Sequence, residues 1–205
     1  MNDFPNSTDV LFREESDSRN GSWLQNPASK HFLYSQGYLM AANTIYAAIE
    51  SDPFRQNTLI YPMVFNYRQF IELQLKELSA MGNRYLGREK DFDEGHRLKE
   101  LWDEYRNNVL KEIDPDFDRV VLDDVERLLV EFAAEDPGST NYRYPFERLA
   151  RGTTPSTRKA SLTRDTLDLK NFKETIDKLV NFFAWQWDLL DSYQVMKDEM
   201  LGDYR

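Results

Sequence analysis

The chain contains no cysteine, which excludes disulfide bonds, thiolate zinc sites, iron–sulfur centres and a cysteine nucleophile. Histidine is nearly as scarce, because His31 and His96 are the only two in the sequence. Neither of them completes the Glu-x-x-His pair from which ferritin-like di-iron sites are built. We therefore expect the protein to have no metal site and no cofactor.

Long apolar runs are also missing. No stretch approaches the roughly 20 apolar residues that a membrane-spanning helix needs. Residues 1–5 lack the basic patch and the apolar run of a secretory signal. The Gly-rich phosphate loop, the GxSxG elbow and the HExxH zinc motif are missing too. These absences predict a cytoplasmic protein without membrane segments, and they remove the common motif-based enzyme classes.

Basic residues are fewer than acidic residues. Lys and Arg number 26 against 36 Asp and Glu, which gives a net charge of −10. A nucleic-acid-binding protein usually gathers its bases on one face, where they replace the counterions of the phosphates. In this chain the bases are spread thinly, and the overall field repels a polyanion. Generic DNA or RNA binding is therefore not expected.

The chain contains enough apolar residues to form one hydrophobic core. Hydrophobic residues make up 40% of the 205 residues, and aromatic residues make up 14%. A chain of this length fits a single domain. Residues 1–28 are polar and are interpreted as an N-terminal arm, whereas residues 29–200 carry the apolar pattern of a domain.

Within residues 29–200, apolar positions recur at helical spacing in five segments. Pro53, Pro115 and the Gly82-Asn83 pair are taken as points where helices stop. The predicted helices span residues 29–51, 58–81, 96–113, 118–134 and 169–200. The fold class is therefore all-α, with a mostly antiparallel bundle of four to five helices. A long irregular loop, residues 136–168, precedes the last helix.

The helix predicted over residues 58–81 is apolar nearly all round, which is typical of a helix in the middle of a bundle. It nevertheless carries Arg68, Glu72 and Lys76 at four-residue spacing along one side. A buried arginine needs a carboxylate, and Glu72 is within reach of Arg68. Three interpretations stay open for these residues: a structural ion pair, a site for an anion or a nucleotide phosphate, and a solvated face.

Two further polar features are candidates for a site. His96 begins the third predicted helix, where it either helps the helix to start or serves as the only available general base near neutral pH. Arg143 and Tyr144 belong to the sequence Tyr-Arg-Tyr-Pro inside the long loop. Tyr144 either pins this loop while Arg143 pairs with an acid, or Arg143 faces an anionic ligand beside Arg68 and His96.

These same segments carry a family resemblance. The sequences YPMVFNYRQFIELQLK at 61–76, GHRLKELW at 95–102, YRYP at 142–145 and LDL at 167–169 resemble a group of uncharacterised bacterial proteins. That group in turn is similar to the HEPN superfamily (higher eukaryotes and prokaryotes nucleotide-binding). The resemblance covers roughly residues 30–190, in order.

The resemblance implies an α-helical bundle that is often paired as a homodimer. Many HEPN proteins are RNA-cutting toxins in toxin–antitoxin and phage-defence systems, and others are non-catalytic partners. Catalytic members carry an Arg followed by a His after four to six residues, whereas the nearest approach in this chain, Arg88 to His96, has seven residues between. Where related proteins often place a His directly after the helix arginine, this chain has Gln69.

The ligand-binding residues that the resemblance carries over have no assigned chemistry, and they are Arg68, Glu72, His96, Arg143 and Tyr144. The leading functional hypothesis is a non-catalytic HEPN-like module that binds a protein partner or a nucleotide or other anionic ligand, in bacterial stress or phage defence. The first alternative is an atypical metal-independent ribonuclease with His96 as its catalytic base. The second alternative is a purely structural homodimer.

Overall fold

The structure is a computed structural model that describes residues 4–17, 19–24, 30–89, 95–147 and 159–202. It divides into two units, Met1–Lys30 and His31–Arg205. In the first unit the described residues form turns, held by local bonds such as the one from Asn6 N to Asp9 Oδ2 at 2.7 Å. The second unit holds the helical domain.

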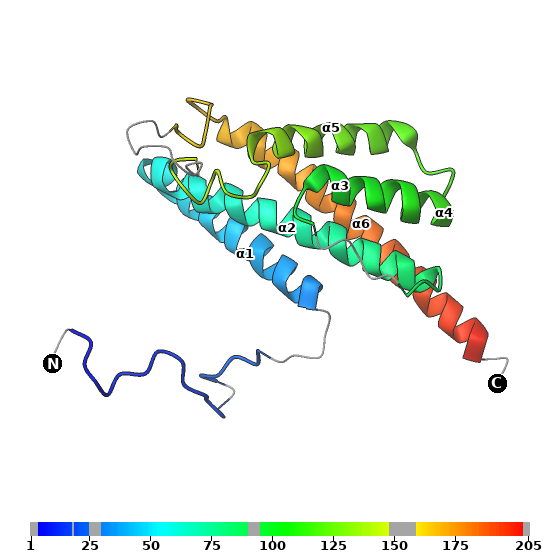
Figure 1. Ribbon diagram of the computed structural model, residues 1–205, viewed down its shortest axis with the longest axis horizontal. Helices are drawn as coiled ribbons and strands as arrows, with labels where there is room; N and C mark the ends of the chain where they lie inside the picture. Colours follow the sequence, from blue (N-terminus) through cyan, green and yellow to red (C-terminus); the bar gives the residue numbers. More distant parts are fainter. Residues whose placement is uncertain (1–3, 18, 25–29, 90–94, 148–158, 203–205) are drawn as a thin grey trace, which may run out of the picture. The chain divides into compact units, whose positions relative to one another are not determined.

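The helical domain confirms the all-α prediction for the part of the chain that the structure describes (Figure 1). Its elements are α1 (Lys30–Ser51), the short 3₁₀ helix η1 (Pro53–Arg55), α2 (Gln56–Tyr85), α3 (Leu98–Asp103), the π-helical stretch η2 (Glu104–Leu110), α4 (Lys111–Ile113), α5 (Arg119–Glu135) and α6 (Leu169–Gly202). Within the described residues the only β pairing is an isolated bridge between Phe146 and Ala160. No described helix has the length and apolar content needed to cross a membrane.

Aspartate side chains begin three of these elements. The Asp52 carboxylate accepts a hydrogen bond from Phe54 N at 3.2 Å, and Asp118 accepts one from Val120 N at 2.8 Å. At the start of α6, Asp168 accepts one from Asn171 N at 3.0 Å, as the sequence predicts. Each bond satisfies a backbone N–H that has no partner inside its own helix.

The third predicted helix, residues 96–113, is a single rod made of α3, η2 and α4, and it begins at Leu98. Its wide π-helical turn lies against Gly82 of α2. A Cβ placed on Gly82 would overlap Val109 Cγ1, so glycine is what lets the two helices approach closely. The expectation that Gly82 and Asn83 end the second helix is therefore wrong, because α2 continues to Tyr85 and uses Gly82 for packing.

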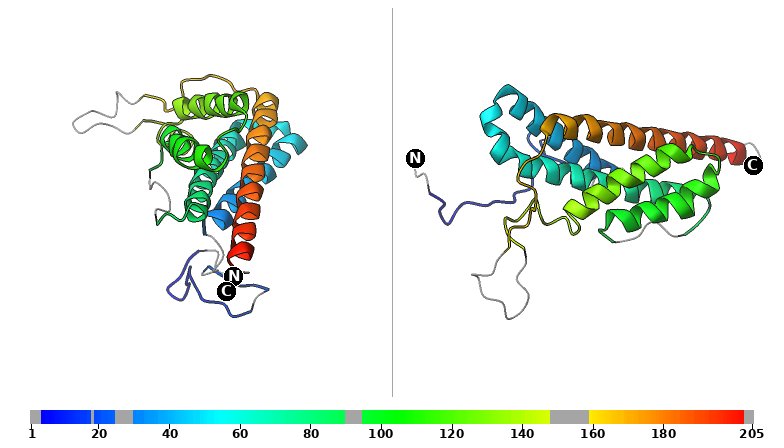
Figure 2. Two further views of the ribbon diagram at one scale, coloured as in Figure 1. Left: turned by 90° about the vertical axis from the view of Figure 1, so that its right-hand side faces the viewer. Right: turned by 90° about the horizontal axis from the view of Figure 1, so that it is seen from above.

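α2 runs through the centre of the domain, and its directions relative to its neighbours are mixed (Figures 1 and 2). α1 is antiparallel to it, since Ser35 bonds to Gln74 and Asn43 bonds to Tyr67. α6 runs parallel to α2, as the ring contacts Tyr67–Phe172 and Tyr85–Tyr193 show.

The rod that begins at α3 also runs parallel to α2, because the chain has returned to the level of Glu72 by His96. α5 runs antiparallel to the rod, with Arg106 bonded to Asp123 and Trp102 bonded to Glu126. The bundle is thus mixed rather than mostly antiparallel. The physical reason is the connector after α2, which is long enough for the next helix to start near the middle of α2 instead of at its end.

The predicted loop 136–168 is irregular where it is described, and its Thr/Ser half around residues 152–157 lies outside the described residues. Its first part packs on the bundle. Tyr142 is buried in the core, and Ser139 Oγ accepts a hydrogen bond from Gln69 Nε2 of α2 at 2.5 Å. This contact places the end of α5 beside the polar face of α2.

Candidate functional site

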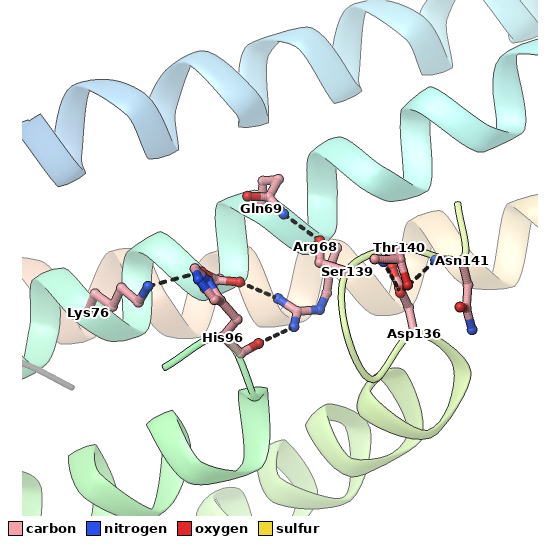
Figure 3. Close-up of polar contacts among 9 residues, drawn as sticks. Arg68, Gln69, Lys76, His96, Asp136, Ser139, Thr140 and Asn141 are labelled. Atoms are coloured by element: carbon pink, nitrogen blue, oxygen red, sulfur yellow. Dashed lines mark hydrogen bonds and ion pairs between the residues drawn. The ribbon is translucent and has the colours of Figure 1, made fainter. Parts of the chain in front are cut away.

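Arg68 lies on the side of α2 that faces the start of the α3 rod, and its side chain is completely buried. Its guanidinium donates from Nη1 to Glu72 Oε2 at 3.1 Å and from Nη2 to the backbone carbonyl of His96 at 2.6 Å (Figure 3). The first bond is the four-residue pairing along one helix that the sequence suggests. The second bond joins two segments of the chain and was not predictable from spacing.

Glu72 is the hub of this polar cluster. Besides the bond from Arg68, its Oε1 accepts a hydrogen bond from Lys76 Nζ at 3.0 Å and contacts His96 Nδ1 at 2.7 Å. Its side chain is only 4% exposed, whereas the His96 side chain is 73% exposed. The cluster is therefore anchored in the interior and reaches the surface at the imidazole.

The pKa of Glu72 reports the balance of these contacts. Burial by itself raises the pKa of this carboxyl. The hydrogen bonds from His96 and Lys76 and the positive charges of Lys76 and Arg68 act in the opposite direction, and together they lower the pKa below its ordinary value. Glu72 is consequently ionised at neutral pH and can only accept hydrogen bonds.

An ionised Glu72 determines the tautomer of His96. Because a carboxylate only accepts, the imidazole must carry a proton on Nδ1, and in the neutral ring the lone pair then resides on Nε2. A histidine oriented by a buried carboxylate, with its second nitrogen toward solvent, has the geometry of a general base. The cluster thus orients His96 for proton transfer, although His96 lines neither the pocket of about 330 Å³ nor the pocket of about 640 Å³.

Asp136, at the end of α5, belongs to the same region and was missed by the sequence analysis. It is fully buried, and its Oδ1 accepts hydrogen bonds from the backbone N of Thr140 at 2.7 Å and of Asn141 at 3.0 Å (Figure 3). Its charge raises the pKa of Arg68, although burial has the larger effect and the pKa of Arg68 is lowered overall. Within the described structure, Asp136 Oδ2 and Arg68 Nε are buried without a hydrogen-bond partner.

These groups balance one another in charge. Arg68 and Lys76 bring two positive charges into the interior, and Glu72 and Asp136 bring two negative ones. Both terminal nitrogens of Arg68 are already bonded, to Glu72 and to the His96 carbonyl, and the side chain is completely buried. The geometry therefore favours a structural role for Arg68, Glu72 and Lys76 over an anion-binding role.

The structure does not bring Arg143 and Tyr144 into this cluster. Arg143 is exposed, and its guanidinium lies 5.5 Å from the ring centres of both Phe65 and Tyr144. These are cation–π contacts at the surface of α2. Among the described residues, no hydrogen bond or ion pair joins Arg143 or Tyr144 to Arg68, Glu72 or His96. Of the five candidates, three therefore form one cluster and two form a separate surface contact.

A second feature, an apolar groove between α5 and α6, was not anticipated from the sequence. Its volume is about 640 Å³. Its lining residues include Val121, Val125, Leu128 and Phe132 from α5, and Phe172, Ile176, Leu179 and Phe182 from α6. The signal for it lies in the apolar positions that recur at helical spacing along residues 118–134. In the structure Val121 is 39% exposed at the edge of this groove.

Among the described residues, no three side chains of His, Asp and Glu are grouped so that they could hold a metal ion. Comparison with protein-family models, with curated proteins and with solved structures gave no match for this chain. The function of the chain is consequently inferred from the geometry of the polar cluster and of the α5–α6 groove.

Proposed function

We propose that the chain is a non-catalytic, HEPN-like helical module whose function is to bind a protein partner in the groove between α5 and α6. The observation that carries the proposal is the groove itself, an open apolar channel of about 640 Å³. Binding sites for organic groups commonly have volumes of about 300–1,000 Å³ and mostly apolar linings. The proposal includes the homodimer and the cytoplasmic location expected from the resemblance and the composition.

The shape of the groove favours an amphipathic helix as the bound element. Two helices form its walls, and their apolar side chains lie between charged residues at the rim, among them Asp124, Arg127 and Lys178. A helix with an apolar stripe and polar flanks matches such a channel, because its stripe fills the floor while its flanks meet the charged rim.

The polar cluster supports the non-catalytic part of the proposal. Arg68 and Glu72 are buried and bonded within the chain, so they are used in holding α2 to the α3 rod. A site that binds phosphate needs cations that a ligand can reach. Arg143, the exposed cation that the sequence analysis placed beside them, is used in contacts with aromatic rings instead.

The test uses two neighbouring residues on α5. Val121 lines the groove, whereas Val120 is 70% exposed and lies outside it. A partner is first isolated from the source cells with the wild-type chain, then purified, and its affinity is measured for the wild type, Val121→Arg and Val120→Arg. We expect Val121→Arg to weaken binding about tenfold or more, because it places a charge in the apolar channel. Val120→Arg should change the affinity less than about twofold.

Equal weakening by the two variants would contradict the assignment of the groove. A thermal shift produced by nucleotides, with no protein partner found, would favour the nucleotide form of the hypothesis instead.

One observation favours a second candidate function, an atypical metal-independent ribonuclease. His96 is exposed and is oriented by Glu72 at 2.7 Å, which is the arrangement of a general base. The measurement is cleavage of unstructured RNA by the wild type and by His96→Ala. Cleavage that disappears in His96→Ala supports this candidate, and cleavage that persists at the same rate removes His96 as the base.

A further inference from the structure

The first helix carries no charge on its outer side. Residues 31–49 contain no Asp, Glu, Lys or Arg, although charged residues make up 30% of the chain. The other long helices of the described structure, α2, α5 and α6, all carry both acidic and basic residues, although those of α2 begin only at Arg68. α1 is therefore the exception, and its composition is typical of a helix that is covered on every side.

In the bundle only one side of α1 is covered (Figures 1 and 2). Its inner side packs on α2 and α6, with Ser35 bonded to Gln74 at 3.0 Å and with the ring of Phe32 5.2 Å from that of Trp187. The outer side bears Tyr34, which is 63% exposed, and Met40, which is 68% exposed. A continuous exposed stripe follows the helical repeat and consists of Leu33, Gly37, Met40, Thr44 and Ala47.

Gly37 has no role in packing within the chain. A Cβ added there would meet nothing within 4 Å. Glycine inside a helix is nonetheless less favourable than alanine. Gly82, the other glycine in the middle of a long helix, has a clear reason in the approach of Val109. By the same physical argument, Gly37 is the position at which something outside the chain could approach α1 closely.

We propose that the outer face of α1 is the contact surface for a second copy of this chain. Electrostatic repulsion is the reason for choosing a second copy as the partner at this face. Each copy carries a net charge of −10, so two copies repel one another across most faces. The stripe on α1 allows contact without placing like charges together. It also leaves no unpaired charge to be buried in the interface.

The stripe is complementary to itself when the two helices run antiparallel. Met40 follows Gly37 by three residues, so both lie on the same face one turn apart. In an antiparallel pair the Met40 side chain of each copy then packs over Gly37 of the other, and Leu33 packs over Thr44. Such an arrangement has two-fold symmetry, in which the same surface is used by both copies. The groove between α5 and α6 takes no part in it, so this inference rests on the homodimer of the proposed function but not on the groove.

The absence of cysteine gives a direct test, since one introduced cysteine is then the only thiol. Val130 on α5 is the matched control, because it is also an exposed apolar helix residue, at 43%. Under mild oxidation we expect Met40→Cys to form a disulfide-linked dimer at micromolar concentration, because the two copies of residue 40 lie within disulfide reach. Val130→Cys should remain largely uncrosslinked under the same conditions.

Sedimentation over a concentration series supplies the second measurement. The wild type should associate to a dimer, Met40→Glu should raise the dissociation constant about tenfold or more, and Val130→Glu should leave it within about twofold. A wild-type chain that stays monomeric at about 100 µM, well above the micromolar range of specific association, overturns the proposal. Equal weakening by Met40→Glu and Val130→Glu overturns it as well, and so does a dimer that crosslinks as well through residue 130 as through residue 40.

Discussion

Arg68 donates from Nη2 to the backbone carbonyl of His96 at 2.6 Å, so one guanidinium ties the middle of α2 to the residue just before the α3 rod. The bond uses the main chain of His96, and the imidazole of the same residue contacts Glu72 at 2.7 Å. His96 is thus bonded twice to α2, through its carbonyl to Arg68 and through its imidazole to Glu72, and these two residues lie one helical turn apart. The long connector after α2 is therefore held at its far end by a polar contact.

Replacing Arg68 should destabilise the fold more than a typical substitution. Arg68→Met keeps much of the side-chain volume but removes the guanidinium that bonds Glu72 Oε2 and that faces the charge of Asp136. We expect the free energy of unfolding to fall by about 3–5 kcal/mol, the usual cost of breaking a buried pair. Urea unfolding followed by circular dichroism measures it. Arg143→Met is the control, because its exposed guanidinium contacts only rings, and a loss as large there would contradict this account.

Glu72→Gln should show a pH-dependent defect. The folded-state pKa of Glu72 lies below its ordinary value of 4.5, so the ionised carboxylate stabilises the fold above that pH, and the stabilisation is lost as the pH falls through the folded pKa. The difference in unfolding free energy between wild type and Glu72→Gln should therefore be constant from about pH 7 to about pH 5 and should shrink below that range.

Urea unfolding of both proteins across that range is the measurement. A difference that stays constant down to about pH 3 would show that Glu72 does not have a lowered pKa in the folded chain.

Two glycines of the long helices should respond in opposite directions to alanine. Gly82→Ala places a methyl group into Val109, and we expect a loss of about 1–3 kcal/mol in the free energy of unfolding. Gly37→Ala places a methyl group in open space, so the helix should gain about 0.5–1 kcal/mol. Thermal and urea unfolding at submicromolar protein compare the two while the chain is monomeric. A gain for Gly82→Ala would mean that α2 and η2 do not approach closely.

Ser139 holds a left-handed backbone conformation, with a φ of 55°, which is unfavourable for a residue with a side chain. Ser139→Gly and Ser139→Ala both remove the hydroxyl that accepts the bond from Gln69. Only the glycine variant relieves the backbone, so it should be more stable than the alanine variant by about 1–2 kcal/mol. Urea unfolding of the two variants measures this difference directly. Equal stabilities would show that the turn after α5 is not strained.

The local part of the fold could be read from the sequence. The helices began near Asp118 and Asp168 because an aspartate there satisfies the first free backbone N–H groups, and these contacts span two or three residues. The pairing of Arg68 with Glu72 followed from a spacing of one helical turn. The end of α2 was placed wrongly at Gly82, because a glycine that ends a helix and one that admits a neighbouring helix look the same in a sequence.

The candidate site was only partly readable. His96 was singled out because it begins the third predicted helix, but its contact with Glu72 depends on the chain returning along α2. Asp136 looked like an ordinary turn residue after α5, and nothing local indicates that its charge faces Arg68. One of the two interpretations of Arg143 placed it beside Arg68 and His96, yet its guanidinium lies against the rings of Phe65 and Tyr144.

By itself, the sequence determined that this protein is helical, that Arg68, Glu72 and Lys76 lie along one side of its central helix, and that cysteine chemistry is excluded. These properties depend on composition and on neighbours within about one helical turn. Only the tertiary structure decided that α2 runs parallel to α6, that His96 and Asp136 join the row, and that α5 and α6 leave a groove between them. These contacts join residues far apart in the chain, and they form only when all the helices pack together.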